Sequence, residues 1–220
     1  MIMKRKFKYA IFDKDGVLTD SVAVSSKIFK KQAREILGAE ISENEFKDLV
    51  GTEWRETLKS YNKNDSIIEK FIKKFHAVLT TEVAESVLFM EVRDIVVILY
   101  KKGLNLFISS SAPQKTVDDF LSREKLDKFF LLGRGNFGVP LDKREHIKEF
   151  ARALNLDVAT FGREAFIIED MVHGIEAAKE LGLFAIGLET SLTAPELKAA
   201  GADVVLPNHA ALLEYLKENL

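Results

Sequence analysis

The chain has 220 residues, of which 47% are hydrophobic and 30% charged, values that exclude a disordered or collagen-like protein and allow one domain with an insertion or two small domains. A net charge of −2 at pH 7 excludes the strong basic field of a typical nucleic-acid-binding protein, so we expect no nucleic-acid partner. The chain contains no cysteine, which excludes disulfides, thiolate nucleophiles and cysteine-ligated metal sites and fits a reducing compartment.

Neither a secretory signal nor a membrane span is expected. Basic residues near the N-terminus are followed only by the short apolar run Tyr9–Phe12 before Asp13, too short for a signal peptide. The longest apolar run elsewhere is Ile95–Tyr100, well below the roughly 18 residues that a membrane helix needs. We therefore expect a cytoplasmic protein with no membrane partner.

Six short apolar runs, each ending in a polar or glycine-containing turn, predict buried β-strands. Helical patterns lie between the later runs, and strands that alternate with helices indicate an α/β fold with a parallel sheet covered on both faces. The predicted strands are Phe7–Phe12, Leu104–Ile108, Phe129–Leu132, Ala165–Ile168, Leu183–Leu188 and Val204–Leu206, and the helices are Lys115–Leu121, His146–Leu154, Gly174–Leu181 and Ala210–Leu216.

The stretch from about Asp20 to Met90 interrupts this alternation, because it holds helical patterns and no strand-like run bounded by turns. Its insertion after the first strand predicts either a lid over the strand ends or a separate helical module. The α/β core would then comprise residues 1–19 and 91–220, and the helical unit residues 20–90. The predicted helices of this unit are Lys27–Leu37, Glu43–Leu49, Trp54–Tyr61 and Ile67–Leu79, the last of which is amphipathic.

Acidic residues follow two of the predicted strands. Asp13 and Asp15 stand two residues apart in the segment FDKDGVLTD, and Gly16 would let the backbone turn tightly toward a ligand. Ligands of open α/β sheets bind beyond the carboxyl ends of the strands, although a plain turn would explain the same residue types. Glu169 and Asp170 end another apolar strand, where two adjacent acids are costly without a cation or hydrogen-bond donors.

These residues resemble the motifs of the haloacid dehalogenase (HAD) superfamily. FDKDGVLTDS is similar to the first motif, hhhDxDG(T/V)LxDS, and LFIS, ending at Ser109, is similar to the second. Lys143 falls where the third-motif lysine is expected, and IIED followed by Gly174 resembles the fourth motif, hhEDSxxGIxAAxxAG. The resemblance covers essentially the whole chain. It implies a Rossmann-like parallel sheet core with an inserted α-helical cap domain.

The resemblance also implies roles for these residues. Asp13 would be the nucleophile that forms an aspartyl-phosphate, and Asp15 the general acid and then the general base. Mg²⁺ would be held by Asp13, the Asp15 backbone carbonyl and Asp170, with Glu169 as an indirect or water-mediated partner. Lys143 would reduce the repulsion between an anionic nucleophile and an anionic substrate.

Phosphate contacts would come from Ser109, from the backbone N–H of Ser110 and from the backbone N–H of Gly16. Two of these assignments have plain alternatives. Ser109 equally suits a residue that ends a strand or caps the helix that follows Pro113. Lys143 stands in a run of four charged residues, Asp142–Glu145, which is typical of a solvated turn.

Several positions depart from the family pattern. Met171 replaces the usual Ser after Glu169 and Asp170, the common KPxP sequence reads KREH from Lys143 to His146, and Glu91 replaces a frequent Gly. We expect Met171 to alter the local loop and Glu91 to bear on the hinge. The four histidines, His76, His146, His173 and His209, show no metal-binding spacing, and surface or local hydrogen-bonding roles are expected.

The predicted function is that of a Mg²⁺-dependent phosphatase acting on a small-molecule phosphate monoester, as a monomer or weak dimer. Asp15 argues against dehalogenases and phosphonatases, which lack an acid there. The β-phosphoglucomutase-like members carry a cap histidine at the position of Ser25, so a mutase is an alternative. A non-catalytic HAD-fold binding protein is another, suggested by the motif departures. Arg55 would bind a substrate carboxylate or second phosphate, or else lie on the surface.

Overall fold

The computed structural model describes residues 6–49, 54–82, 87–136 and 142–220. These residues fall into two compact units, one comprising Met1–Thr19 and Leu88–Leu220 and the other Asp20–Val87. That the second unit acts as a cap stays a prediction. No helix in the described ranges is both long enough and apolar enough to cross a membrane.

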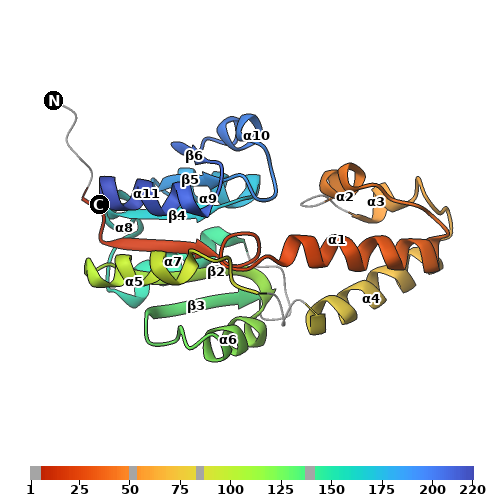
Figure 1. Ribbon diagram of the computed structural model, residues 1–220, viewed down its shortest axis with the longest axis horizontal. Coiled ribbons are helices and arrows are strands. Elements are labelled where there is room, and N and C mark those ends of the chain that lie inside the picture. The colour runs from red at the N-terminus through yellow and green to blue at the C-terminus, as the bar shows by residue number, and fades with distance from the viewer. Residues whose placement is uncertain (1–5, 50–53, 83–86, 137–141) are drawn as a thin grey trace. The chain divides into compact units, whose positions relative to one another are not determined.

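The first unit is built on a six-stranded sheet in the order β3-β2-β1-β4-β5-β6, with every neighbouring pair parallel (Figure 1). The predicted α/β fold class is therefore confirmed. The first strand lies at the centre of the sheet, so its carboxyl end is flanked by strand ends on both sides. The strands are β1 (Tyr9–Asp13), β2 (Asn105–Pro113), β3 (Phe130–Asn136), β4 (Ala165–Glu169), β5 (Phe184–Leu188) and β6 (Val204–Leu206).

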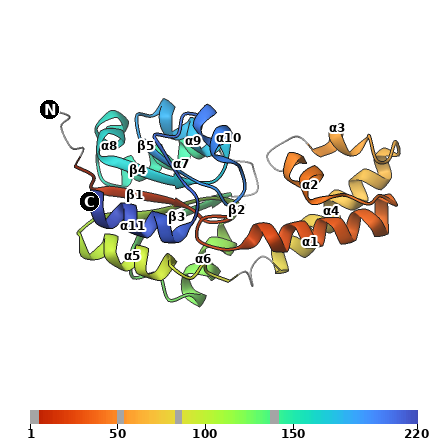
Figure 2. The same ribbon diagram turned by 45° about the horizontal axis from the view of Figure 1, so that its top comes forward.

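Helices cover both faces of this sheet because successive strand residues point to opposite faces. Ala10 and Phe12 of β1 belong to one apolar cluster, with α5, α6 and α11, while Tyr9 and Ile11 belong to a second, with α7, α8, α9 and α10 (Figure 2). The helices are α5 (Val92–Lys101), α6 (Gln114–Arg123), α7 (Lys143–Ala153), α8 (Val158–Glu164), α9 (Val172–Glu180), α10 (Ala194–Ala199) and α11 (His209–Asn219).

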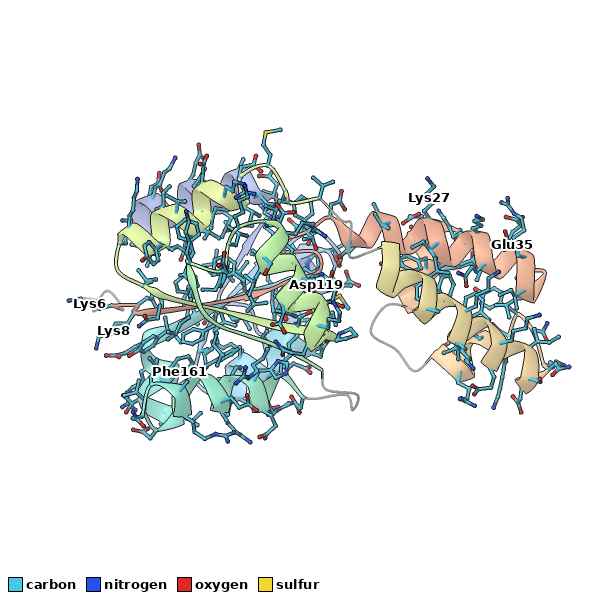
Figure 3. The ribbon with its side chains drawn as sticks, turned by 90° about the horizontal axis from the view of Figure 1, so that it is seen from below. Lys6, Lys8, Lys27, Glu35, Asp119 and Phe161 are labelled. Atoms are coloured by element: carbon cyan, nitrogen blue, oxygen red, sulfur yellow. The ribbon has the colours of Figure 1, made fainter. Side chains whose placement is uncertain are left out.

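Aromatic packing fixes α7 and α8 on the second face. Phe161 of α8 stacks on Tyr9 with 4.8 Å between ring centroids (Figure 3), and Phe150 of α7 packs at 4.7 Å from Phe107 of β2. All four rings are buried. The N-terminal residue of α7 is thereby held at the edge of the sheet where the strands end.

The second unit is helical, as the sequence predicts, and packs around Phe29, whose ring lies 5.0 to 5.3 Å from those of Phe46, Phe71 and Phe75. Its first helix begins at Ser21, before the predicted start, and ends in a π-helical turn. The exposed Lys27 of this helix points outward (Figure 3). The elements are α1 (Ser21–Gln32), η1 (Ala33–Leu37), α2 (Glu43–Leu49), α3 (Trp54–Leu58) and α4 (Asp65–Glu82).

Candidate active site

Four predicted site residues meet at the carboxyl edge of the sheet. Asp13 ends β1 and pairs in register with Ser109 of β2, and Glu169 ends the neighbouring β4. Lys143 is the first residue of α7, whose start is fixed because the Asp142 carboxylate accepts a hydrogen bond from the Arg144 N–H at 2.9 Å. Residues far apart in the sequence are thus brought together by the parallel strand ends.

Lys143 is the ion-pair partner of two of these carboxylates. Its Nζ lies 2.6 Å from Asp13 Oδ1 and also contacts Glu169 Oε1. The Lys143 side chain is only 4% exposed, so the interpretation of a solvated charged turn is wrong at this position. Lys143 therefore lies next to Asp13, and its role as the third-motif lysine stays a prediction.

Burial governs the electrostatics of this cluster. It raises the pKa of Asp13 to about 7, with Glu169 and Asp15 adding to the rise and Lys143 opposing it. Burial also raises the pKa of Asp170 well above its usual range, and the nearby charges of Asp13 and Glu169 act in the same direction. Burial opposes the charged form of Lys143, but the two carboxylates outweigh it and raise its pKa. One ammonium therefore faces three buried carboxylates.

Asp170 has one oxygen held by donors and one without. Its Oδ2 accepts hydrogen bonds from Ser191 Oγ and, at 3.4 Å, from Thr190 Oγ1, both in the turn after β5. Its Oδ1 is buried and has no hydrogen-bond partner among the described residues. Such an orphaned acceptor is costly unless a cation or a donor meets it.

These oxygens fit a metal ion. Carboxylate oxygens of Asp13, Glu169 and Asp170 lie within 4.8 Å of one another. Hard divalent cations such as Mg²⁺ prefer an all-oxygen ligand set. A carboxylate oxygen of Asp13 and the unpartnered Oδ1 of Asp170 are the best-suited ligands for such a cation.

Glu169 serves a different purpose, because both of its oxygens are occupied. Oε1 meets Lys143, and Oε2 accepts the backbone N–H groups of Asp170 at 3.0 Å and Met171 at 3.1 Å. Glu169 therefore fixes the loop that carries Asp170, in keeping with an indirect role at a metal. The expected effect of Met171 on this loop is limited, since its backbone is held by Glu169.

Two glycines make room for these carboxylates. Gly16 has φ +87°, and a Cβ there would lie 1.9 Å from Asp170 Oδ2. The Gly16 carbonyl oxygen also accepts a hydrogen bond from Thr190 Oγ1 at 2.6 Å. Gly174 plays the same part for Glu169, because a Cβ would lie 2.0 Å from Glu169 Oε1. Gly16 thus belongs to the packing around Asp170.

Asp15 does not pair with Lys143 but with a different lysine, Lys14. Its Oδ1 forms an ion pair with Lys14 Nζ at 2.6 Å and lies 3.5 Å from Thr19 Oγ1. The Lys14 side chain is 1% exposed, and its ammonium lies 5.7 Å from the ring centroid of Phe120. Sequence reasoning missed Lys14, although a lysine between two acids at a strand end was a visible signal.

Ser109 and Ser110 are both buried within β2, where Ser109 lies opposite the last residue of β1. Ser109 Oγ lies 2.9 Å from His146 Nδ1, and Ser110 Oγ accepts a hydrogen bond from the Ala112 N–H at 3.1 Å. The helix-capping alternative is wrong, because α6 begins after Pro113 and no side chain caps it. His146 is buried, and its hydrogen bond joins α7 to β2, so the expected surface or local role is wrong for this histidine.

Two positions singled out in the sequence show ordinary local structure. Arg55 lies in the helical unit, where its exposed guanidinium pairs with the carboxylate of Glu69. Glu91 has φ −84°, a conformation that needs no glycine.

Comparison with known protein families shows which family the chain belongs to. The family described as haloacid dehalogenase-like hydrolase matches residues 10–188. The chain belongs to this family. It is therefore an enzyme, a hydrolase, and the resemblance seen in its motifs is confirmed.

A curated phosphatase is similar to this chain in sequence, and several solved structures share its fold. A phosphorylated carbohydrates phosphatase from Thermotoga maritima is 27% identical over 218 residues, covering 96% of this chain and 98% of that protein. A solved structure of a predicted phosphoglycolate phosphatase from Haemophilus somnus has a TM-score of 0.78 at 18% identity, covering 96% and 98% of the two chains. A candidate β-phosphoglucomutase from Thermotoga maritima has a TM-score of 0.73 at 26% identity, covering 97% and 100%.

Replacing Gly16 with Ala tests the contact between this glycine and Asp170. Gly103 has φ +83° and nothing within 4 Å of an added Cβ, so it is a matched control for backbone strain alone. We expect Gly103→Ala to lower the free energy of unfolding by about 1–2 kcal/mol. Gly16→Ala should lose about 1–3 kcal/mol more, because Asp170 must move. Urea unfolding measures the free energy of unfolding of both variants. Equal losses in the two variants would contradict the close contact between Gly16 and Asp170.

Replacing Lys143 with Met tests the charge balance. Without the ammonium, the three carboxylates repel one another and the pKa values of Asp13 and Asp170 rise further. In metal-free buffer at about pH 8 we therefore expect a loss of about 3–5 kcal/mol in unfolding free energy. A carboxyl group whose folded pKa is raised binds more protons in the folded state, so stability returns as the pH falls through that pKa. The loss should therefore shrink at about pH 5.

The control is Lys148→Met on the same helix, whose half-exposed ammonium pairs with Glu145. It should change the unfolding free energy by less than about 1 kcal/mol at either pH. Urea unfolding at both pH values gives the comparison. A pH-independent loss in Lys143→Met would show that lost packing, and not charge, is responsible.

Proposed function

We propose that this enzyme is a Mg²⁺-dependent phosphatase that hydrolyses a small phosphate monoester through an aspartyl-phosphate on Asp13. The observation that carries the proposal is the buried Asp13 carboxylate, 2.6 Å from Lys143 Nζ and beside the unpartnered Oδ1 of Asp170. A carboxylate at such a position can act as a nucleophile while positive charge faces the anionic substrate.

Asp13 attacks phosphorus with one carboxylate oxygen, and the bond from phosphorus to the ester oxygen breaks. Asp15 donates a proton to the departing oxygen and then accepts one from the water that hydrolyses the acyl phosphate, which restores both carboxyl groups. To donate that proton, Asp15 must exchange its ion pair with Lys14 for a contact with the substrate. Ser109 and the Ser110 N–H are proposed to hold phosphoryl oxygens.

Asp13 and Asp170, together with the Asp15 backbone carbonyl, are proposed to hold Mg²⁺. The ion would supply positive charge that offsets the repulsion between Asp13 and the phosphoryl oxygens. Lys143 adds to this effect and favours the ionised form of Asp13, because its charge opposes the burial that raises the pKa of Asp13. Glu169 keeps Asp170 in place through the loop contacts described above.

Sugar phosphates are the proposed substrate class, because the Thermotoga maritima relative is a phosphorylated carbohydrates phosphatase. The candidate β-phosphoglucomutase among the solved structures keeps a phosphotransferase as the second candidate. Ser25 disfavours it, because the resemblance places a proton-transferring histidine there and the Ser25 hydroxyl instead donates to the Ser21 carbonyl oxygen at 2.7 Å. A substrate role for Arg55 would require it to leave Glu69.

The test is release of inorganic phosphate from a panel of sugar phosphates and other small monoesters, with and without Mg²⁺. Asp13→Asn should lower kcat by at least about 10³-fold, because it removes the attacking oxygen. Asp118→Asn, an exposed carboxylate on α6, is the matched control and should retain activity.

Phosphate release that survives in Asp13→Asn would refute the aspartyl-phosphate route. A folded enzyme that releases no phosphate but interconverts sugar phosphates would identify a mutase. Binding of esters by the folded protein without any turnover would contradict the proposed reaction.

A further inference from the structure

His146 and Ser109 form a buried polar pair next to Asp13. Ser109 Oγ lies 2.9 Å from His146 Nδ1, and the two residues are 0% and 1% exposed. His146 lies one helical turn after Lys143 on α7, so one turn of this helix contacts both Asp13 and Ser109. The other ring nitrogen of His146, Nε2, is buried without a hydrogen-bond partner in the described part of the chain.

The surroundings of His146 favour its neutral imidazole form. Burial lowers its pKa, and the charge of Lys143 lowers it further. One ring nitrogen therefore carries a proton and the other carries a lone pair. Which nitrogen is protonated determines which partner donates in the bond between His146 and Ser109.

The two tautomers have opposite consequences for phosphate binding. If the proton is on Nε2, Nδ1 accepts from Ser109 and the single hydroxyl proton of Ser109 is used inside the protein. Ser109 would then present only lone pairs to an anionic ligand. If the proton is on Nδ1, His146 donates to Ser109 Oγ, and the hydroxyl proton can be donated to a phosphoryl oxygen.

We propose that His146 is a positioning residue that donates its Nδ1–H to Ser109 and thereby directs the Ser109 hydroxyl proton toward the phosphoryl group. This inference rests on the proposed function, because it requires phosphate to bind at Ser109. It gives a role to a residue at which the chain departs from the KPxP pattern. His146 itself does not contact the substrate.

Binding of inorganic phosphate, measured by calorimetry in the presence of Mg²⁺, tests the positioning role. His146→Leu should raise the Kd for phosphate by about 3- to 10-fold, the effect of one neutral hydrogen bond. His146→Asn places an amide N–H near the position of Nδ1 and should stay within about 2-fold of the wild type. In a Ser109→Ala background, His146→Leu should have no further effect, because the two residues act as a unit.

Steady-state kinetics gives a second readout. A contact made equally to bound substrate and transition state changes KM and leaves kcat nearly unchanged, so His146→Leu should raise KM alone. If His146→Leu and His146→Asn weaken phosphate binding equally, or if the Ser109→Ala and His146→Leu effects add, His146 is a packing residue and the inference fails.

The tautomer can be observed directly in the phosphate complex by ¹⁵N NMR of the imidazole nitrogens. The chain has only four histidines, and the His146 signals are identified by their absence in His146→Asn. We expect Nδ1 to be protonated, and protonation at Nε2 would overturn the inference while leaving the proposed function standing. Failure of the wild type to bind phosphate at all would overturn both.

Discussion

The buried ammonium of Lys143 lies between the carboxylates of Asp13 and Glu169, and the arrangement of the α/β unit depends on holding these charges together. With Asp170 beside them, one positive charge cannot balance three carboxylates. Burial makes the imbalance costly, and the raised pKa values of Asp13 and Asp170 are its direct expression. A folded protein retains such a cluster only when another cation or function compensates for its cost.

The scaffold around the cluster is explained by this constraint. Parallel strands place the ends of β1 and β4 side by side, and the capped start of α7 delivers Lys143 between them. Gly16 and Gly174 leave space that side chains would fill, so the carboxylates of Asp170 and Glu169 can approach the backbone closely. Thr190 and Ser191 tie the opposite oxygen of Asp170, so that Oδ1 alone is left for a ligand.

Much of this could be predicted from the sequence, because short apolar runs and ordered motifs are local signals. The six strands and the acidic strand ends were found in this way. The helices α8 and α10 were not predicted. The T-x-x-E spacing of Thr193 and Glu196, which form a capping box at the start of α10, was a visible signal. Asp20, a favoured N-cap residue type, stands before the early start of α1, although its side chain caps no backbone N–H in the structure.

The missing parts of the site depend on tertiary packing. Whether Lys14 is buried against Phe120 or turned to solvent is decided by α6, which is distant in sequence. The bond between His146 and Ser109 requires α7 to lie on β2, and the contacts of Thr190 and Ser191 require the turn after β5 to approach Asp170. Motif spacing identifies the candidate reacting carboxylates. It does not identify the side chains that position them by hydrogen bonds and packing.

The most direct test of the charge account is the effect of Mg²⁺ on thermal unfolding of the wild type and of Asp170→Asn. A ligand that binds only the folded state raises the unfolding midpoint with concentration. We predict a rise for the wild type and a requirement for at least about 10-fold more Mg²⁺ in Asp170→Asn, which loses one charged ligand. Equal responses of the two proteins, or no response of the wild type, would contradict the account.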